Sequence, residues 1–236
     1  MNQKIPLYFI LFYLYLIQYL LRTETIPLKT RAYNNELRRQ QQAELKARIA
    51  AATAELHAAK GAIATSYADI AKQAGVSLPT VYSHFPTQHD LIQGCTTHAI
   101  SMAPALPVAK IFAAPDLPSA TKLLVAAMEQ QHLYFEPWSS WRENGVIPFL
   151  TEMYAGIRQA TAALVGKLLV QHGVRGGLRE TVAVWESLLC FDFWHRLVRE
   201  HQLPRSAARR VIVQSLLAVV GPTPASPSTP SPRRKK

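Results

Sequence analysis

The chain has 236 residues, of which 49% are hydrophobic and 17% charged, which is enough for one large domain or two small ones with a proper core. Its two cysteines, Cys95 and Cys190, exclude a disulfide framework and fit a reducing cytoplasm. The formal net charge of +11 favours a polyanionic partner, but residues 36–102 carry six basic and five acidic side chains, so bulk charge alone locates no binding region for such a partner.

Residues 5–21 form an apolar run, IPLYFILFYLYLIQYLL, that only Pro6 and Gln18 interrupt. Its length is close to that of the shortest membrane spans, about 17 residues. Basic residues flank the run, and if it inserted they would keep the rest of the chain in the cytoplasm. Three interpretations stay open: a membrane anchor, a buried or interfacial helix, or a segment outside the functional protein because the start codon is assigned too far upstream. Residues 1–35 are therefore treated as an apolar extension and a basic connector.

Residues 36–59 are predicted to form a long helix. Four apolar residues recur there at helical spacing on one face: Leu45, Ile49, Ala52 and Leu56. Arg38 and Arg39 lie at the start of this helix and could reach DNA phosphates across a groove. A solvated helix end is the equally open alternative for these two arginines.

Residues 65–91, TSYADIAKQAGVSLPTVYSHFPTQHDL, contain the strongest pattern in the chain. Ser66 is predicted to cap a first helix, with Asp69 at its third position, where an acidic side chain is favourable. Ile70 faces inward on this helix. Gly75 follows directly, at a point where a left-handed backbone costs little only for glycine.

A second, shorter helix is predicted to begin after Ser77, its cap, with Pro79 in the first turn, where a missing N–H costs little. Val76 and Val81 close the small core. The other side chains of this helix are expected to face outward in various directions: Leu78, Pro79, Thr80, Tyr82, Ser83 and His84. This order of cap, small residue, glycine, cap and apolar residues is typical of a helix-turn-helix, with an ordinary helical hairpin as the alternative.

The stretch resembles the DNA-binding domain of the tetracycline-repressor (TetR) family of bacterial transcriptional regulators. The resemblance covers about residues 45–95, from the apolar stripe of the first helix through Gly61-Ala62-Ile63-Ala64-Thr65 to His84-Phe85-Pro86 and Asp90-Leu91. Two positions depart from the family pattern. His57 stands where the family usually has an aromatic residue, and Gln88 stands where it usually has a lysine that holds DNA phosphate.

The resemblance implies how the second helix would read DNA. Leu78, Pro79 and Thr80 would contact bases or thymine methyls, and Thr65, Tyr82 and His84 would contact phosphates. No arginine on this helix can read guanine in a bidentate manner, so specificity would depend on methyl contacts and DNA shape. The complete predicted DNA-binding set is Thr65, Ser77, Leu78, Pro79, Thr80, Tyr82, Ser83, His84, Arg38 and Arg39.

Cys95 and His98 have further possible metal ligands near them in the sequence, since His84 and His89 precede them. The spacing of these residues is not that of a zinc site, and no second close ligand pair is present. We therefore expect Cys95 to belong to the core and the chain to use no metal and no cofactor.

Residues 103–120 contain four prolines and mark a boundary between two domains, residues 36–102 and residues 103–220. Beyond this boundary the patterns are helical without strand alternation, so an all-α fold is expected, with Pro137 to Pro148 as a loop. The resemblance implies that this second domain binds a small effector. Aromatic, Met and Cys side chains are the predicted pocket, with plain core packing as the alternative: Met128, Trp138, Trp141, Tyr154, Trp185, Cys190 and Trp194.

Two adjacent apolar helices, at about residues 178–201 and 205–220, suit a helix–helix homodimer interface. The resemblance implies a cytoplasmic, nucleoid-associated repressor that binds a palindromic operator as a homodimer and is released by a small-molecule effector. Residues 221–236 are rich in Pro, Ser and Thr and end in basic residues, so a disordered tail is expected.

An enzyme and a membrane-tethered protein are the two rival classes. An enzyme would need a nucleophile and a base, such as Cys190 with Asp192 and His195, but Cys190 and Asp192 would point to different faces of a helix. No glycine pattern for phosphate binding accompanies them, so no enzymatic activity is expected. The other rival is a membrane-tethered helix-turn-helix regulator or interaction protein anchored by residues 5–21.

Overall fold

The computed structural model of the protein describes residues 31–220, without the side chains of residues 31–34 and Asn144. The apolar run at residues 5–21 and the tail at residues 221–236 lie outside this range. Within it, every regular element is a helix, which confirms the all-α prediction. No helix among residues 31–220 combines the length and the apolar character that a bilayer crossing requires.

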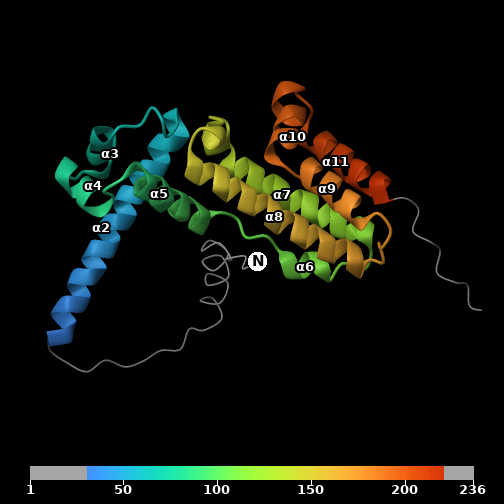
Figure 1. The fold of residues 1–236 in the computed structure, drawn as a ribbon, viewed down its shortest axis with the longest axis horizontal. Coiled ribbons are helices and arrows are strands. Elements are labelled where there is room, and N and C mark those ends of the chain that lie inside the picture. The colour runs from blue at the N-terminus through green and yellow to red at the C-terminus, as the bar shows by residue number, and fades with distance from the viewer. Residues whose placement is uncertain (1–30, 221–236) are drawn as a thin grey trace, which may run out of the picture. The chain divides into compact units, whose positions relative to one another are not determined.

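The helices follow one another along the chain (Figure 1) as α2 (Arg31–Lys60), α3 (Tyr67–Ala74), α4 (Leu78–His84), α5 (Gln88–Met102), α6 (Val108–Phe112), α7 (Leu117–Ser139), the 3-10 turn η1 (Glu143–Gly145), α8 (Pro148–Gln171), α9 (Leu178–Leu188), α10 (Phe191–His195), the π-helical turn η2 (Arg196–Glu200) and α11 (Arg205–Val220). The described chain divides into two packed units. The first comprises residues 31–105 and 133–159, and the second comprises residues 106–132 and 160–220.

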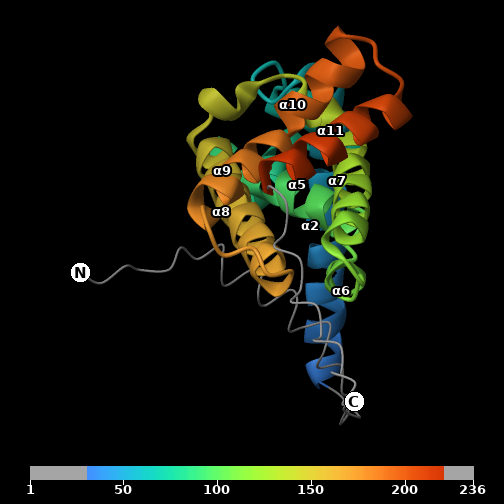
Figure 2. The ribbon, with the colours of Figure 1, turned by 90° about the vertical axis from the view of Figure 1, so that its right-hand side faces the viewer.

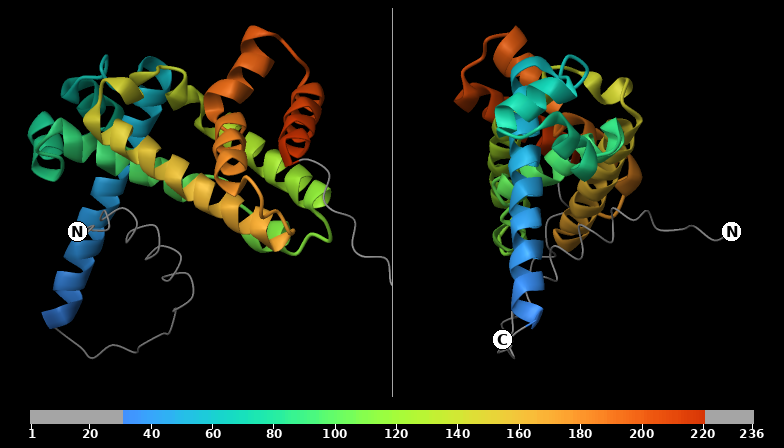
Figure 3. Two further views of the ribbon diagram at one scale, coloured as in Figure 1. Left: turned by 45° about the vertical axis from the view of Figure 1, so that its right-hand side comes forward. Right: turned by 90° about the vertical axis from the view of Figure 1, so that its left-hand side faces the viewer.

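The first unit is built around the four helices α2 to α5, which run from blue to green in Figure 3. Its core contains Ile49 of α2, Ile70 of α3, Val81 of α4 and Leu91 of α5, all almost completely buried. Leu45 and Leu56 pack against the same core, so the apolar stripe predicted for the first helix faces inward as expected.

Helix α2 begins at Arg31, five residues before the predicted start at residue 36. Its N-terminal part extends beyond α3 to α5, and residues 35–44 are exposed to solvent (Figures 1 and 3). The exposed part is polar, which explains why the apolar spacing used for the prediction began only at Leu45. A hydrogen bond of 3.1 Å between the Gln40 amide and the Glu44 carboxylate supports this polar segment at helical spacing.

The chain around the end of α7 also belongs to the first unit, and it is held to α2 by two indoles. Trp138 Nε1 donates to the carbonyl oxygen of Ala54 at 2.9 Å, and Trp141 Nε1 donates to that of Ala58 at 3.1 Å. Pro137 does not end α7, contrary to the prediction of a loop there. It lies two residues before the helix ends, where its absent N–H removes only one late hydrogen bond.

The carboxylate of Glu143 completes this attachment. It accepts hydrogen bonds from the backbone N–H groups of Ala62 and Ile63, at 2.8 and 2.9 Å, in the turn between α2 and α3. Gly61 precedes them with φ +81°, and a Cβ built there would lie 2.6 Å from Glu143 Oε1. We call the side chains of Trp138, Trp141 and Glu143 the α2 clasp.

The second unit packs α6, the first part of α7, the last part of α8 and the helices α9 to α11 around a separate core (Figure 2). Trp185 of α9 is fully buried and donates its indole N–H to the carbonyl oxygen of Leu216 in α11 at 2.9 Å. Leu124, Leu168 and Ile212 bring α7, α8 and α11 into this core, since each is almost completely buried.

The single helix predicted over residues 178–201 is wrong, because the chain forms α9, α10 and η2 there. Cys190 causes the break. Its backbone is extended at φ −72° and ψ 158°, and its Sγ accepts a hydrogen bond from the N–H of Phe193 at 3.4 Å, which starts a new helix. A short helix, α6, also lies within the proline-rich boundary segment, where none was expected.

Candidate nucleic-acid interface and effector pocket

Helix α3 is fixed at both ends by local hydrogen bonds. Ser66 Oγ accepts from the N–H of Asp69, and the Asp69 carboxylate accepts from the N–H of Ser66, which together make a capping box. The Lys60 ammonium lies 2.7 Å from the same carboxylate, and its hydrogen bond holds the pKa of Asp69 well below the usual range. At the other end, Gly75 adopts φ +63°, so the chain turns sharply towards α4.

Helix α4, the predicted recognition helix, begins where the sequence indicated. Ser77 caps it and accepts from the N–H of Thr80 at 3.3 Å, and the hydroxyls of these two residues lie 2.7 Å apart. Val81 is completely buried and anchors the helix to the core. Leu78 and Tyr82 remain 39% and 48% exposed, so two large side chains of this helix face away from the protein interior.

The ring of Tyr82 is held by a second tyrosine. Tyr67, at the start of α3, stacks on it with 4.4 Å between ring centroids and 8° between ring planes. This contact was not expected from the sequence, although two tyrosines on neighbouring short helices were a signal for it. Stacking restricts the rotamers of the Tyr82 side chain and therefore the positions that its hydroxyl can take.

The other predicted DNA-binding residues have different degrees of exposure. Pro79, Ser83, Ser77, Arg38 and Arg39 are exposed, and Thr80, His84 and Thr65 are partly buried. The hydroxyl of Thr65 donates to the carbonyl oxygen of Gly61 at 2.7 Å, so it retains only its capacity to accept. All of these residues belong to the first unit, and six residues of the predicted set lie on α4.

His57 occupies the position where an aromatic residue was anticipated, and it behaves as a neutral core residue. It is 5% exposed, and burial lowers its pKa to about 4. Its Nδ1 lies 3.4 Å from the Sγ of Cys95, whose own pKa burial raises to about 12. Across residues 31–220 there is no group of three or more His, Cys, Asp or Glu side chains placed to hold a metal ion.

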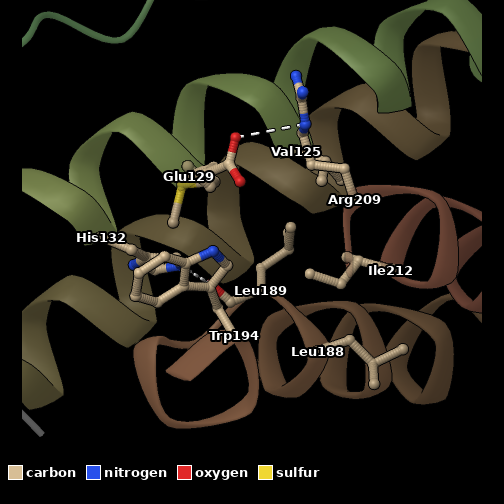
Figure 4. A pocket seen from close by; sticks show the side chains of 9 residues that line it. Val125, Glu129, His132, Leu188, Leu189, Trp194, Arg209 and Ile212 are labelled. Carbon is tan, nitrogen blue, oxygen red and sulfur yellow. Dashed lines mark hydrogen bonds and ion pairs between the residues drawn. The ribbon is translucent and has the colours of Figure 1, made fainter. Parts of the chain in front are cut away.

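The second unit contains a small cavity among α7, α9, α10 and α11, drawn in Figure 4. Its free volume is about 10 Å³, close to what one water molecule requires. The residues that line it are Val125, Met128, Glu129, His132, Leu188, Leu189, Trp194, Arg209 and Ile212. Met128 and Trp194 are therefore the two predicted pocket residues that the structure brings together at this cavity.

The other five predicted pocket residues lie elsewhere. Trp138 and Trp141 bind α2 in the first unit, where the Tyr154 hydroxyl lies 3.1 Å from that of Ser139. Trp185 and Cys190 belong to the second unit but do not line this cavity. The Cys190 thiol, which caps α10, has its pKa raised by burial, so it is a weak nucleophile.

The polar residues of the cavity were not predicted from the sequence. Glu129 is 1% exposed, and its carboxylate is 3.3 Å from the guanidinium groups of both Arg205 and Arg209. His132 Nε2 lies 3.0 Å from the carbonyl oxygen of Leu189, and burial lowers the pKa of this histidine to about 4. Because this partner is a carbonyl, Nε2 carries the proton. The sequence did contain a signal for them, because Glu129 and His132 follow Val125 at i+4 and i+7 and so place polar side chains on an apolar helix face.

Three structural features define a class of protein: a capped helix-turn-helix with an exposed second helix, an all-helical fold and a second helical unit. This combination is that of a helix-turn-helix transcription regulator. Residues 49–95 match the family model described as bacterial regulatory proteins of the tetR family. Residues 49–95 therefore form a DNA-binding domain of the tetR type.

Solved structures with the same fold have low sequence identity to this chain. A protein from Mesorhizobium loti MAFF303099, assigned to the TetR family of transcriptional regulators, has a TM-score of 0.58 at 17% identity, over 81% of this chain and 98% of its own. A regulator from Saccharomonospora viridis, in complex with choline, has a TM-score of 0.57 at 19% identity, over 74% and 96%.

A third structure is that of NalD from Pseudomonas aeruginosa, the secondary repressor of the MexAB-OprM multidrug efflux pump. Its TM-score is 0.52 at 18% identity, over 75% of this chain and 96% of its own. No curated protein matches the sequence significantly. At these identities the structures establish the fold that the chain shares with them.

Proposed function

We propose that this protein is a ligand-responsive repressor that binds a palindromic operator as a homodimer. The geometry of α4 carries the proposal: Ser77 caps it, buried Val81 anchors it, and Leu78 and Tyr82 face outward. A helix presented in this way fits the major groove of duplex DNA with its first turns against the base edges. The family of its DNA-binding domain supports the same assignment.

One recognition helix of seven residues contacts too few base pairs for tight binding, so a symmetric dimer is required. Helices α9 and α11 are our proposed dimer interface. They expose apolar side chains that a partner would cover, since Val184, Val211 and Val219 are 38%, 38% and 41% exposed. Two such helices from each protomer would make a four-helix contact.

The effector would bind in the second unit, beside Met128 and Trp194. The dimer binds its operator only in the state in which the spacing of its two recognition helices matches the DNA. A ligand that binds more tightly to a second state, with another spacing, would lower the DNA affinity. At saturation, the affinity would fall by up to the ratio of the ligand's affinities for the two states. The S. viridis structure contains choline, and NalD is a repressor, which supports this mode of action for a protein of the same fold.

Selection from a random pool of duplexes tests the proposal directly. The purified chain is expected to enrich one palindromic sequence, and fluorescence anisotropy is expected to give a dissociation constant of about 10⁻⁸ M or lower at physiological salt. Mapping the protein on its genome should recover the same sequence. Failure to enrich any duplex, or enrichment that vanishes in competition with unrelated DNA, would contradict it.

A further inference from the structure

A groove between α7 and α11 carries three cationic side chains and no carboxylate. It is lined by Lys122, Val125, Ala126, Ser206, Arg209, Arg210, Val213 and Gln214 and has a volume of about 400 Å³. That volume lies in the range of pockets that hold small organic molecules, about 300–1,000 Å³. Val125 is buried, and Ala126 and Val213 are partly buried, so an apolar surface lies between the cationic groups.

The groove lies next to the small cavity of Figure 4, since Val125 and Arg209 line both. The balance of charge there is positive. Glu129 supplies one carboxylate, which Arg205 contacts through Nε and Nη2 and Arg209 contacts through Nε, all at 3.3 Å. The carboxylate is therefore already shared by two guanidinium groups, and it cannot also neutralise Lys122 and Arg210.

Trp194 adds a hydrogen-bond donor that nothing accepts. The residue is 1% exposed, and its Nε1 has no hydrogen-bond partner within the described structure. Figure 4 shows the indole nitrogen on the ring edge turned towards Glu129, inside the cavity. A buried donor without an acceptor is destabilising, because it has lost its hydrogen bond to water and gained none in the protein. A ligand that brought an acceptor to this point would relieve that destabilisation.

From these contacts we infer the chemical class of the effector: a carboxylate with a compact apolar body. This inference rests on the proposed function, because it concerns the ligand of the proposed effector site. The carboxylate lies against Arg209, Arg210 and Lys122, where three positive charges favour an anion. The apolar body covers Ala126 and Val213, the partly buried apolar residues of the groove. An ammonium ligand at the same point would meet three like charges, which disfavours it.

The inner cavity is too small to admit the ligand as it stands, at about 10 Å³. Met128 lies at its wall and is partly buried, and a methionine side chain rearranges at low cost. Movement of Met128 would let a second acceptor atom, on a ligand that carries one besides its carboxylate, approach the Trp194 indole N–H. Loss of that N–H in Trp194→Phe is therefore expected to weaken binding of such a ligand about fivefold or more and to change binding of benzoate, which has no second acceptor, less than twofold.

Isothermal titration calorimetry on the full chain tests the ligand class. The probes are benzoate, 2-naphthoate and decanoate as carboxylates, choline and benzyltrimethylammonium as cations, and inorganic phosphate as an anion without an apolar body. At least one carboxylate is expected to bind about tenfold more tightly than every cation and than phosphate. Cations that bind as tightly as the carboxylates, or no carboxylate binding below about 1 mM, would overturn the inference.

Two double variants locate the site. Lys122→Met with Arg210→Gln removes two groove cations other than the arginines that bind Glu129, and it is expected to weaken carboxylate binding about tenfold. Lys167→Met with Arg175→Gln removes the same charges from exposed positions of the same unit and is expected to change binding less than twofold. Equal losses in both variants would show general electrostatic attraction and no site in the groove.

The DNA measurement separates this inference from the proposed function. If the chain binds its selected operator but no carboxylate binds in the groove, the ligand class is wrong and the repressor assignment stands. If carboxylates bind and both double variants behave as expected while no duplex is bound, the repressor assignment is wrong. Release of the operator on addition of the carboxylate supports both.

Discussion

Gly61, in the turn after α2, is a residue that no side chain can replace without strain. Its backbone has φ +81°, and a Cβ would lie 2.6 Å from Glu143 Oε1 and 3.3 Å from the Trp141 ring. Gly61→Ala is therefore expected to lower the free energy of unfolding by about 1–3 kcal/mol, measured by urea denaturation. Gly156→Ala is the control, because its Cβ would meet nothing within 4 Å and alanine favours a helix. Equal stability of the two variants would contradict the proposed clash.

Tyr82 and Thr80 are expected to differ in the kind of DNA binding they support. Tyr82 is exposed and stacked on Tyr67, which suits a phosphate contact, so Tyr82→Ala should weaken binding to cognate and scrambled duplexes alike, by about 1–2 kcal/mol. Thr80 lies in the first turn of α4, so Thr80→Ala should reduce binding to the cognate duplex more than to the scrambled one. Fluorescence anisotropy on both duplexes measures this difference. Equal losses for Thr80→Ala would remove its role in base readout.

The residues of the helix-turn-helix could be predicted because each acts within a few positions of its neighbours. The caps Ser66 and Ser77, the left-handed Gly75 and the buried Val81 all lie where the sequence indicated. Glu143 could not be predicted, because it binds backbone groups about 80 residues away and no local periodicity reports such a contact. Trp138 and Trp141, predicted as pocket residues, were chosen by size alone, which does not distinguish a ligand wall from a packed joint.

At the scale of an element, α7 contributes to both units, which its sequence pattern did not predict. Residues 117–132 belong to the second unit, where Val125, Glu129 and His132 line the cavity, and residues 133–139 belong to the first unit. The prediction ended this helix at Pro137, but α7 continues to Ser139. Trp138, the first residue of the α2 clasp, therefore lies on the helix and not in a loop. A proline is a strong signal against a helix interior, but a weak one in a last turn.

The Glu143 carboxylate is expected to be the most important member of the α2 clasp. Glu143→Gln leaves one acceptor oxygen for the two N–H groups of Ala62 and Ile63 and removes the charge that strengthens both bonds. The expected loss is about 1–3 kcal/mol in the free energy of unfolding, measured by thermal or urea denaturation. Glu152→Gln, at an exposed position of α8, is the matched control and should be neutral within about 0.5 kcal/mol. A neutral Glu143→Gln would show that water replaces the carboxylate at this turn.

At the scale of the whole molecule, two buried histidines make the stability of the protein depend on pH. Burial lowers the pKa of His57 in the first unit and of His132 in the second to about 4, from an unfolded value of 6.5. Between these values the unfolded chain binds more protons than the folded one, so stability is complete above about pH 7 and is lost as the pH falls from 6.5 towards 4. Each histidine accounts for at most about 3 kcal/mol of this loss.

Thermal unfolding between about pH 7.5 and 4.5 measures the effect, and His57→Phe is the informative variant. An aromatic ring fills the same buried site without taking up a proton, so the melting temperature of the variant should fall less steeply with pH than that of the parent chain. Parallel curves for the two proteins would show that His57 does not contribute. The choice of phenylalanine follows from the family pattern, from which this chain departs at that position.

The proposed homodimer is tested by a charge at the exposed apolar face of α11. Val211 is 38% exposed there, as is Val184 on α9, and a dimer through these helices would bury both. Val211→Glu would place an unpaired carboxylate in that interface, which costs several kcal/mol and should yield a monomer by analytical ultracentrifugation. The monomer should retain weak binding to a half-site, because α4 is unchanged, but should lose at least about a hundredfold in affinity for the palindrome.

Ala163→Glu is the control for this experiment. It adds the same charge at an exposed position of α8 and should leave both the dimer and the affinity for the palindrome unchanged. A Val211→Glu chain that remains a dimer would place the interface on another surface, and one that is monomeric yet binds the palindrome unchanged would separate DNA binding from dimerisation.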